Sequence, residues 1–295
     1  MQLYALGSGL VRVTPTSAAN GFVGSLARTY YDLGSKRARW ARANLELAFP
    51  DLSASERDEI GRASYANFMT HALDFIRSES WSDDELRARV EVSGEEHAER
   101  ALAKGRGLLL LTLHMGNFEV GVQAFSLALR DHHPCIVGRP MRNEALYARI
   151  TAGRSRGTTE VIDRRQAGIR MLRALRASRP VGVLLDQYSR RSRGVFVPLF
   201  GVRCSTSAGM ATLAVRTGCP VVPCYALSEG PDRHRAIFLP ELDIHYTGDR
   251  EKDIPATTAR YNEVLEAIIR EHPEQWMWGH RRFRHSPDLD RDLYT

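Results

Sequence analysis

His114 and Glu119 are the two residues whose types and spacing most directly suggest chemistry. His114 follows a largely apolar run, residues 107–113, and a run of this length is typical of a strand buried on both faces. The histidine therefore lies at the carboxyl end of the predicted strand, where open α/β folds bind their ligands. A short turn containing Gly116 then leads to Glu119, so the turn can bring the imidazole and the carboxylate together.

A carboxylate beside a histidine fixes one tautomer of the ring and stabilises the cation that forms when the ring is protonated. The other ring nitrogen can then take a proton from a hydroxyl, which is general base catalysis. From the spacing alone, a histidine hydrogen-bonded only to backbone groups is the alternative interpretation. The two interpretations differ in whether this strand end carries a catalytic base.

A second strand end repeats the pattern further along the chain. Residues 181–185 form another apolar run, and Asp186 and Gln187 follow it. This repeats the arrangement at His114, with polar residues at the carboxyl end of an apolar strand. An aspartate at such a place more commonly caps a loop, and neither residue receives a definite role from the sequence.

Strands alternate with helices through most of the chain. The predicted strands are residues 90–92, 107–113, 134–138, 159–162, 181–185 and 221–227, with an edge strand at 237–242. The predicted helices are residues 22–33, 53–71, 82–89, 93–104, 120–129, 144–153, 166–177, 203–217 and 256–269. Two of them begin at Ser-x-x-Glu capping boxes, at Ser53 and Ser82. This alternation predicts an α/β fold with a mostly parallel central sheet, helices on both faces, and a helical N-terminal segment before it.

The composition is that of an ordinary globular protein, with 43% hydrophobic and 26% charged residues. Arginine supplies nearly all of the positive charge behind the net charge of +6, because lysine occurs only at positions 36, 104 and 252. Arginine binds phosphate and carboxylate groups bidentately, which suits an anionic headgroup, a phosphopantetheine carrier or nucleic acid. Biased codon usage explains the same composition.

Several chemistries lack their usual motifs. The sequence contains no glycine-rich phosphate loop, no H-E-x-x-H zinc motif and no G-x-S-x-G nucleophile elbow. The cysteines, at positions 135, 204, 219 and 224, show no metal-binding spacing and favour buried thiols in a reducing compartment. No apolar stretch reaches the ~18 residues of a membrane span, and the N-terminus does not resemble a cleaved signal. We expect a soluble or peripheral protein on the cytosolic side, without a bound metal or cofactor.

The first 40 residues are expected to form a separate N-terminal segment. Apolar and aromatic residues at helical spacing over 22–33 precede a basic cluster that begins at Lys36. This combination is typical of a helix that lies in an anionic membrane interface. A helix packed against the rest of the domain fits the same residues.

Six motif blocks give the chain a resemblance to a known family. The block H-M-G-N-F-E runs from His114 to Glu119, and the block V-G-V-L-L-D-Q ends at Gln187. The other blocks are R-A-N-L with F-P from Arg42, R-P-M-R-N from Arg139, G-V-F-V-P-L-F-G from Gly194, and the closing W-M-W-G-H-R-R-F from Trp276. In this order, over about residues 42–284, they resemble the bacterial lipid A biosynthesis (late-step) acyltransferases, a branch of the glycerolphosphate-acyltransferase-like superfamily.

This resemblance implies an O-acyltransferase. His114 would be the general base on an acceptor hydroxyl, and Glu119 would orient it. The hydroxyl would attack an acyl thioester directly, without an enzyme nucleophile, while arginines or backbone N–H groups stabilise the oxyanion. The donor would be a thioester of acyl carrier protein or coenzyme A. The acceptor would be a lipid A precursor at the cytoplasmic face of the bacterial inner membrane, where the protein would be peripheral.

The resemblance also implies a set of binding residues. The substrate-binding positions are Asn117, Arg139, Asn143, Arg154, Arg156, Asp186 and Gln187. An apolar loop would form the wall of an acyl-chain groove through Phe196, Pro198 and Phe200. The α/β acyltransferase domain is expected over residues 41–285, after the N-terminal segment 1–40 and before a loose tail at 286–295.

Two alternatives remain open. Related enzymes acylate phosphatidylinositol mannosides or other glycolipids with similar blocks, although they tend to carry aspartate at the position of Glu119. A non-catalytic protein that binds nucleic acid or an anionic membrane is the more remote alternative, suggested by a pI of about 9.3 and the H-R-R-F-R-H segment. Such a protein would bind polyanions in a salt-sensitive way without needing His114. As an enzyme, the chain is expected to have no nucleic-acid partner.

Overall fold

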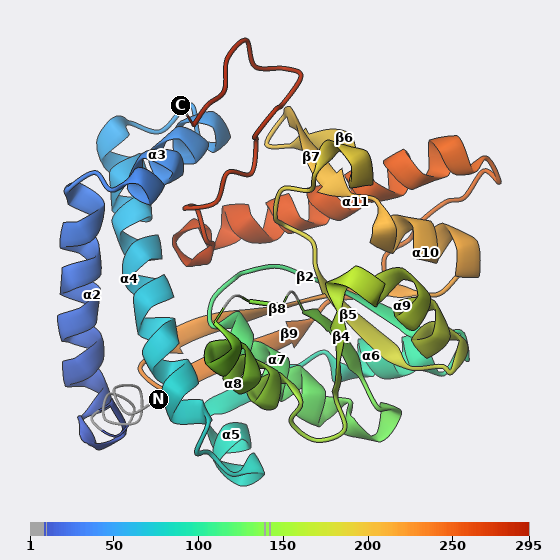
Figure 1. Cartoon of the computed structure of the whole chain (residues 1–295), viewed down its shortest axis with the longest axis horizontal. Coiled ribbons are helices and arrows are strands. Elements are labelled where there is room, and N and C mark those ends of the chain that lie inside the picture. Colours follow the sequence, from blue (N-terminus) through green and yellow to red (C-terminus); the bar gives the residue numbers. More distant parts are fainter. Residues whose placement is uncertain (1–8, 10, 139, 142, 295) are drawn as a thin grey trace.

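The computed structural model describes residues 9, 11–138, 140–141 and 143–294. At its centre is a seven-stranded sheet in the order β1-β9-β8-β2-β5-β3-β4 (Figure 1). Neighbouring strands are parallel except for β8 and β9, which form an antiparallel hairpin. The strands are β1 (Val90–Ser93), β2 (Leu108–Thr112), β3 (Cys135–Gly138), β4 (Glu160–Asp163), β5 (Pro180–Leu184), β8 (Val221–Gly230) and β9 (Arg233–Phe238).

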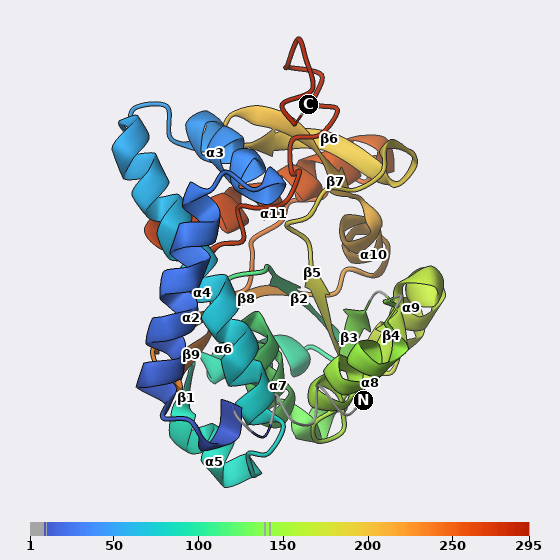
Figure 2. The same cartoon turned by 60° about the vertical axis from the view of Figure 1, so that its left-hand side comes forward.

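Helices surround this sheet and form the N-terminal part of the chain (Figures 1 and 2). They are α2 (Thr16–Asp32), α3 (Lys36–Ala48), α4 (Ala54–Ser78), α5 (Asp83–Arg89), α6 (Glu95–Leu102), α7 (Phe118–Ala128), α8 (Glu144–Arg154), α9 (Ala167–Arg176), α10 (Gly209–Thr217) and α11 (Arg250–Glu271). Short 3-10 turns lie at η1 (Arg130–His132), η2 (Arg164–Gln166), η3 (Arg191–Arg193) and η4 (Pro273–Gln275). Both predicted capping boxes form, at the starts of α4 and α5. The predicted α/β class is confirmed.

The central strand β2 is buried on both of its faces. Leu109 and Leu111 point to one side, where they share a core with α9, α10 and α11. Leu108 and Leu110 point to the other side, against α6 and α7. Because successive side chains of a strand alternate between the two faces, both sets must be apolar. The unbroken apolar run before His114 follows from this double burial.

The helix α4 lies between the N-terminal helix α2 and the rest of the domain (Figure 1). Its Gly61 sits directly beneath the ring of Tyr31, where an added Cβ would approach the Tyr31 hydroxyl oxygen to 2.2 Å. Tyr31 in turn donates a hydrogen bond to Asp58 at 2.8 Å. One face of α2 is therefore packed against α4, while Leu26 and Tyr30, on its other face, are more than half exposed. The segment 1–40 is thus, over its described part, both packed and amphipathic.

Three predicted elements are wrong. Residues 194–201 were expected as a loop, but β6 (Gly194–Leu199) pairs antiparallel with β7 (Val202–Ser207). β7 also replaces the start of the predicted helix 203–217, because α10 begins only at Gly209. The strand predicted at the edge over 237–242 is instead β9, which lies inside the sheet between β1 and β8. Pro198 argues against a central strand, but β6 belongs to a two-stranded hairpin, where a missing N–H is tolerated.

The C-terminal segment packs back onto the domain, so the expectation of a loose tail is not met up to residue 294. Tyr294 is 8% exposed, and its hydroxyl donates to Oδ1 of Asn44 at 2.6 Å. The same hydroxyl accepts the backbone N–H of Phe283 at 2.8 Å. Asp288 forms an ion pair with Arg203. These contacts tie the end of the chain to α3 and to β7.

Candidate active site

His114 and Asp186 come together at the carboxyl edge of the sheet, where each follows the end of its strand. Nδ1 of His114 lies 2.8 Å from Oδ1 of Asp186. The second carboxylate oxygen of Asp186 accepts the backbone N–H of His114 at 3.1 Å and the indole N–H of Trp276 at 2.8 Å. The side chain of His114 is 17% exposed and that of Asp186 only 3%. The imidazole therefore covers a fully buried carboxylate and is itself reachable from solvent.

The surroundings of Asp186 keep its carboxylate ionised. Burial alone would raise the pKa of Asp186, but the positive charge and hydrogen bonds of His114, with the bond from Trp276, lower it to about 2. An ionised carboxylate is an acceptor only, so Nδ1 of His114 carries the proton between them. The lone pair of the neutral ring is then on Nε2. His114 is arranged as a proton acceptor at Nε2.

Glu119 does not take the orienting role predicted for it. It lies in the first turn of α7, and its carboxylate oxygens accept hydrogen bonds from Nε and Nη2 of Arg154 at 2.9 and 2.8 Å. Both side chains are largely buried, at 15% and 13% exposure. This bidentate pair holds the start of α7 to the last turn of α8. The carboxylate that orients His114 is Asp186, because the Nδ1 side of the ring faces the neighbouring strand β5.

The turn between His114 and α7 is closely constrained. Gly116 has φ of +51°, and an added Cβ would lie 2.4 Å from the carbonyl oxygen of Ala226. Its N–H donates to the carbonyl of Gln275 at 3.0 Å. Asn117, predicted to bind substrate, is instead a buried helix cap that accepts the N–H of Val120. The turn thus fixes the backbone directly after the histidine.

The other predicted binding residues are held within the fold to different degrees. Asn143 caps α8 through its side-chain oxygen. Arg156 donates to Gln123 at 3.1 Å and pairs with Asp83 at 3.1 Å, which are contacts within the protein. Arg139 lies outside the described residues, so a substrate role for it stays a prediction.

The residues predicted to line an acyl groove do not form one surface. Phe200 is 6% exposed, and its ring packs at 6.5 Å, centroid to centroid, from that of Trp276. Pro198 is exposed and Phe196 half-buried, both on β6. Phe200 is therefore corrected to a core residue. It supports the indole that donates to Asp186.

Two residues of the closing segment reach the site, although sequence analysis gave neither a role. Trp276 donates to Asp186, and Nε2 of His280 accepts the backbone N–H of Tyr188 at 3.0 Å. Burial lowers the pKa of His280 to about 4, although Asp186 acts to raise it, so the ring is neutral and able to accept. The W-x-W-x-H block contains both residues, but the block alone does not show that they lie near His114 and Asp186.

Two residues of the basic closing segment are internal. Arg282 is fully buried and donates to the carbonyl of Ser205 at 2.9 Å and to the hydroxyl of Thr206 at 2.6 Å. Phe283 is 1% exposed. A surface for polyanions needs such side chains exposed. The burial of these two residues weakens the alternative of a nucleic-acid binding protein.

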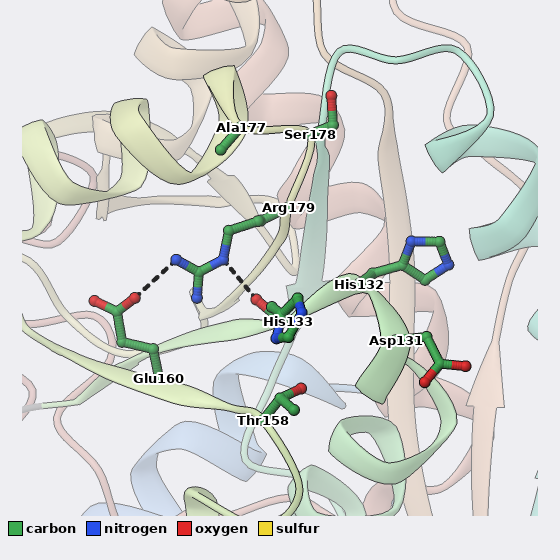
Figure 3. Close-up of a pocket in the computed structure, with 8 residues that line it drawn as sticks. All are labelled: Asp131, His132, His133, Thr158, Glu160, Ala177, Ser178 and Arg179. Carbon is green, nitrogen blue, oxygen red and sulfur yellow. Dashed lines mark hydrogen bonds and ion pairs between the residues drawn. The ribbon is translucent and has the colours of Figure 1, made fainter.

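A hollow of about 590 Å³ lies at the opposite edge of the sheet, where β3, β4 and β5 begin (Figure 3). It is lined by Asp131, His132, His133, Thr158, Glu160, Ala177, Ser178 and Arg179. Figure 3 shows Arg179 between Glu160 and His133: Nη1 donates to the carboxylate at 2.9 Å and Nε to the backbone carbonyl at 2.7 Å. This hollow is thus distant along the strands from His114, and its arginine is paired within the protein.

Metal ligands do not gather in the part of the chain that the structure describes, where no three His, Cys, Asp or Glu side chains stand in a metal-binding arrangement. The cysteines Cys135, Cys204, Cys219 and Cys224 are free and buried.

Comparison with known proteins identifies the family of this chain. The sequence model of the family described as "Bacterial lipid A biosynthesis acyltransferase" matches residues 1–285. The lipid A biosynthesis lauroyltransferase of Escherichia coli (strain K12) is 33% identical over 258 residues, which cover 86% of this chain and 81% of that protein. The lipid A biosynthesis palmitoleoyltransferase of the same organism is 27% identical over 276 residues, covering 92% and 86%.

A phosphatidylinositol mannoside acyltransferase of Mycolicibacterium smegmatis is also similar, at 28% identity over 278 residues that cover 92% of this chain and 88% of that protein. The family model matches nearly the whole chain, and the relatives align over most of their own length. The chain belongs to the bacterial lipid A biosynthesis acyltransferase family, and it is an acyltransferase.

Proposed function

We propose that this acyltransferase moves a fatty acyl chain from a thioester to a hydroxyl of a glycolipid, with His114 as the general base. The observation that carries the proposal is the 2.8 Å bond between Nδ1 of His114 and the buried carboxylate of Asp186. It leaves Nε2 as the nitrogen of the ring that can accept a proton. Such an arrangement activates a hydroxyl, which fits the transfer of an acyl group to an alcohol.

The chemistry needs no covalent intermediate on the protein. Nε2 takes the proton of the acceptor hydroxyl as its oxygen attacks the thioester carbonyl. The tetrahedral intermediate then collapses, the carbon–sulfur bond breaks, and the departing thiolate takes the proton from the imidazolium. Asp186 stabilises that cation in between. The buried cysteines do not compete as nucleophiles: burial raises the pKa of Cys135 to about 11 and that of Cys224 to about 12.

The first turn of α7 is suited to the charge that develops on the attacked carbonyl. It begins at Phe118, whose ring packs edge-on against His114 with 4.7 Å between the ring centroids. The start of a helix carries a partial positive charge, which stabilises an oxyanion. The pair of Glu119 and Arg154 fixes where this helix start lies. These two residues position the site, and a direct contact with substrate is not required of them.

The acceptor is proposed to be a lipid A precursor, because the E. coli relatives and the family are both named for lipid A biosynthesis. A phosphatidylinositol mannoside is the second candidate, because the mycobacterial relative acts on that lipid by name. Acyl carrier protein is the proposed donor partner, with coenzyme A as the alternative carrier. Both deliver the acyl group as a thioester, as the site chemistry needs.

The exposed face of α2 supports a peripheral place on the cytoplasmic face of the bacterial inner membrane. Phe22, Leu26 and Tyr30 recur every four residues and are 67%, 53% and 56% exposed. Lys36 and Arg37 follow at the start of α3 and are also exposed. An apolar row beside cations suits an anionic lipid surface. Within the described residues, every helix is too short or too polar to cross a bilayer.

The test is mass spectrometry of lipid A from a bacterial strain that lacks a late acyltransferase and expresses this chain. Wild type should add one acyl mass, whose size gives the chain length, and His114→Ala should add none at equal expression. The same addition by both proteins would remove His114 from the mechanism. If neither protein adds a mass, the lipid A proposal fails and mannoside acceptors are tested with the same pair.

A further inference from the structure

The side chain of Gln187 lies on the catalytic edge of His114. Its Nε2 is 3.2 Å from Nε2 of His114. Because Nδ1 of the ring carries the proton shared with Asp186, Nε2 of the ring is an acceptor, and the amide nitrogen is the end of the carboxamide that can donate to it. The lone pair that would take a proton from the acceptor is thus already hydrogen-bonded within the protein.

An acceptor hydroxyl must stand in the same place. A proton is transferred to a general base over about 2.6–3.2 Å between heavy atoms, or through one water. The carboxamide nitrogen of Gln187 lies within this distance of Nε2 of the ring. The hydroxyl and the carboxamide cannot both donate to one lone pair, so Gln187 has to leave before the reaction begins.

The surroundings allow the side chain to move while its backbone stays. Asp186 on one side is held by His114 and Trp276. On the other side, the N–H of Tyr188 is bonded to His280, and the N–H of Ser189 to the carbonyl of Ser205 at 3.0 Å. Gln187 itself is only half-buried, so rotation about its side-chain bonds is enough to uncover Nε2.

We propose that the carboxamide of Gln187 caps the general base in the free protein and is displaced by the hydroxyl of the acceptor. The inference deepens the proposed function and rests on it. An uncapped base beside a bound thioester would activate water: the water oxygen would attack the carbonyl, the carbon–sulfur bond would break, and a carboxylic acid and a thiol would leave. The cap keeps water from Nε2 until the acceptor arrives, which favours transfer over hydrolysis.

The first test does not depend on catalysis. Diethyl pyrocarbonate modifies unprotonated imidazole nitrogens, and peptide mass spectrometry gives the rate at each histidine. In Gln187→Ala, the rate at His114 should rise about three- to tenfold, because a hydrogen bond worth about 1 kcal/mol no longer competes. The rate at the exposed His133 is the internal standard, and Gln166→Ala, an exposed glutamine on η2, is the matched control. An unchanged rate at His114 would overturn the cap.

The second test uses an acyl-coenzyme A thioester as the probe. Release of free thiol without any acceptor should be faster for Gln187→Ala than for wild type, and the ratio of hydrolysis to transfer should rise. Gln187→Ser replaces the alanine variant if that variant does not fold. A faster modification of His114 without a higher ratio would overturn the protective role. If no variant, wild type included, transfers acyl groups to a glycolipid, the proposed function fails, while the modification rates still decide whether Gln187 covers His114.

Discussion

His114 and Asp186 are joined by the register of two parallel strands. β2 and β5 are adjacent, and their last pair is Thr112 with Leu184. His114 and Asp186 each lie two residues beyond that pair, one on each strand end. Between them, the N–H of Leu185 donates to the carbonyl of Thr112 at 3.0 Å. The contact between the two side chains thus extends the pairing of β2 with β5 beyond its last residue pair. A shift of either strand would separate the two side chains.

Asp186→Asn should reduce acyl transfer by about 10²–10⁴-fold, the range that general base catalysis typically contributes. The amide oxygen of the asparagine can accept the hydrogen bond from Nδ1–H, but a neutral amide does not stabilise the charge of the imidazolium. The measurement is kcat with a thioester donor, beside a thermal melt that checks the fold. Activity within threefold of wild type would show that Asp186 only supports the backbone of His114.

Glu119→Gln should lose less activity than His114→Ala, because Glu119 fixes the start of α7 and does not touch the imidazole. Its effect should appear in stability: Glu119→Ala leaves Arg154 largely buried without its partner, and breaking a buried pair in this way costs about 3 kcal/mol. The free energy of unfolding is measured in urea. The double variant Glu119→Gln, Arg154→Met should recover much of the loss, since no charge is left unpaired. A larger loss of activity in Glu119→Gln than in His114→Ala would restore Glu119 as a direct participant.

The sequence identifies the apolar strands and the polar residues at their ends, but not which ends meet. The runs before His114 and Asp186 are visible because burial on both faces demands unbroken apolar residues. The pairing of β2 with β5 joins residues 72 positions apart and depends on the order of the whole sheet. Glu119 is nearer in the sequence and was therefore the more obvious partner, yet its helix turn directs it to Arg154.

Lowering the pH should destabilise the folded protein. Burial lowers the pKa of His71 to about 3 and those of His234 and His280 to about 4. In the unfolded chain, the three histidines take up protons near pH 6.5, whereas in the folded protein they stay neutral down to about pH 4. The unfolded state therefore binds more protons in this range, and the stability of the fold decreases as the pH drops from about 6.5 toward 4. Burial and the nearby Asp232 raise the pKa of Asp74 to about 6, which offsets part of this loss.

Urea unfolding at pH 7.5 and pH 5.0 tests this dependence. Each proton that the unfolded chain binds and the folded chain does not changes the free energy of unfolding by about 1.4 kcal/mol per pH unit, between the pKa values of the two states. The midpoint should be lower at pH 5.0, and His71→Gln should reduce the difference between the two conditions. Equal midpoints at both pH values would contradict the neutral, buried state of these histidines.

Leu26→Glu should weaken binding to vesicles that contain anionic lipid, by about tenfold, because a buried apolar side chain contributes roughly 1.5–3 kcal/mol when fully transferred. The matched control is Ile169→Glu on α9, which replaces an apolar side chain of 66% exposure far along the chain from α2. Co-sedimentation measures both. Equal losses in the two variants would assign the effect to charge alone and remove α2 as the docking surface.

The hairpin of β6 and β7 and the contacts of the closing segment could not be predicted from the sequence for one physical reason: both depend on residues outside the local segment. Residues 194–199 alternate buried Val197 and Leu199 with exposed Pro198, but a proline and flanking glycines also describe a loop. The hairpin exists because β7 supplies its hydrogen-bond partners. Trp276 and Tyr294 likewise act only through residues far away in the sequence, Asp186 and Asn44. The local sequence pattern predicts which residues are buried, but only the tertiary contacts determine which distant residues they meet.

The role of His114 as general base is tested most directly by the rate of acyl transfer by the purified protein in a single turnover, with wild type beside His114→Ala. The donor is an acyl thioester and the acceptor a lipid A precursor, at a pH where the wild-type rate is constant. A loss of at least about 10²-fold is expected in His114→Ala, with an unchanged thermal melt. A folded His114→Ala protein that transfers acyl groups within threefold of the wild-type rate would contradict this role.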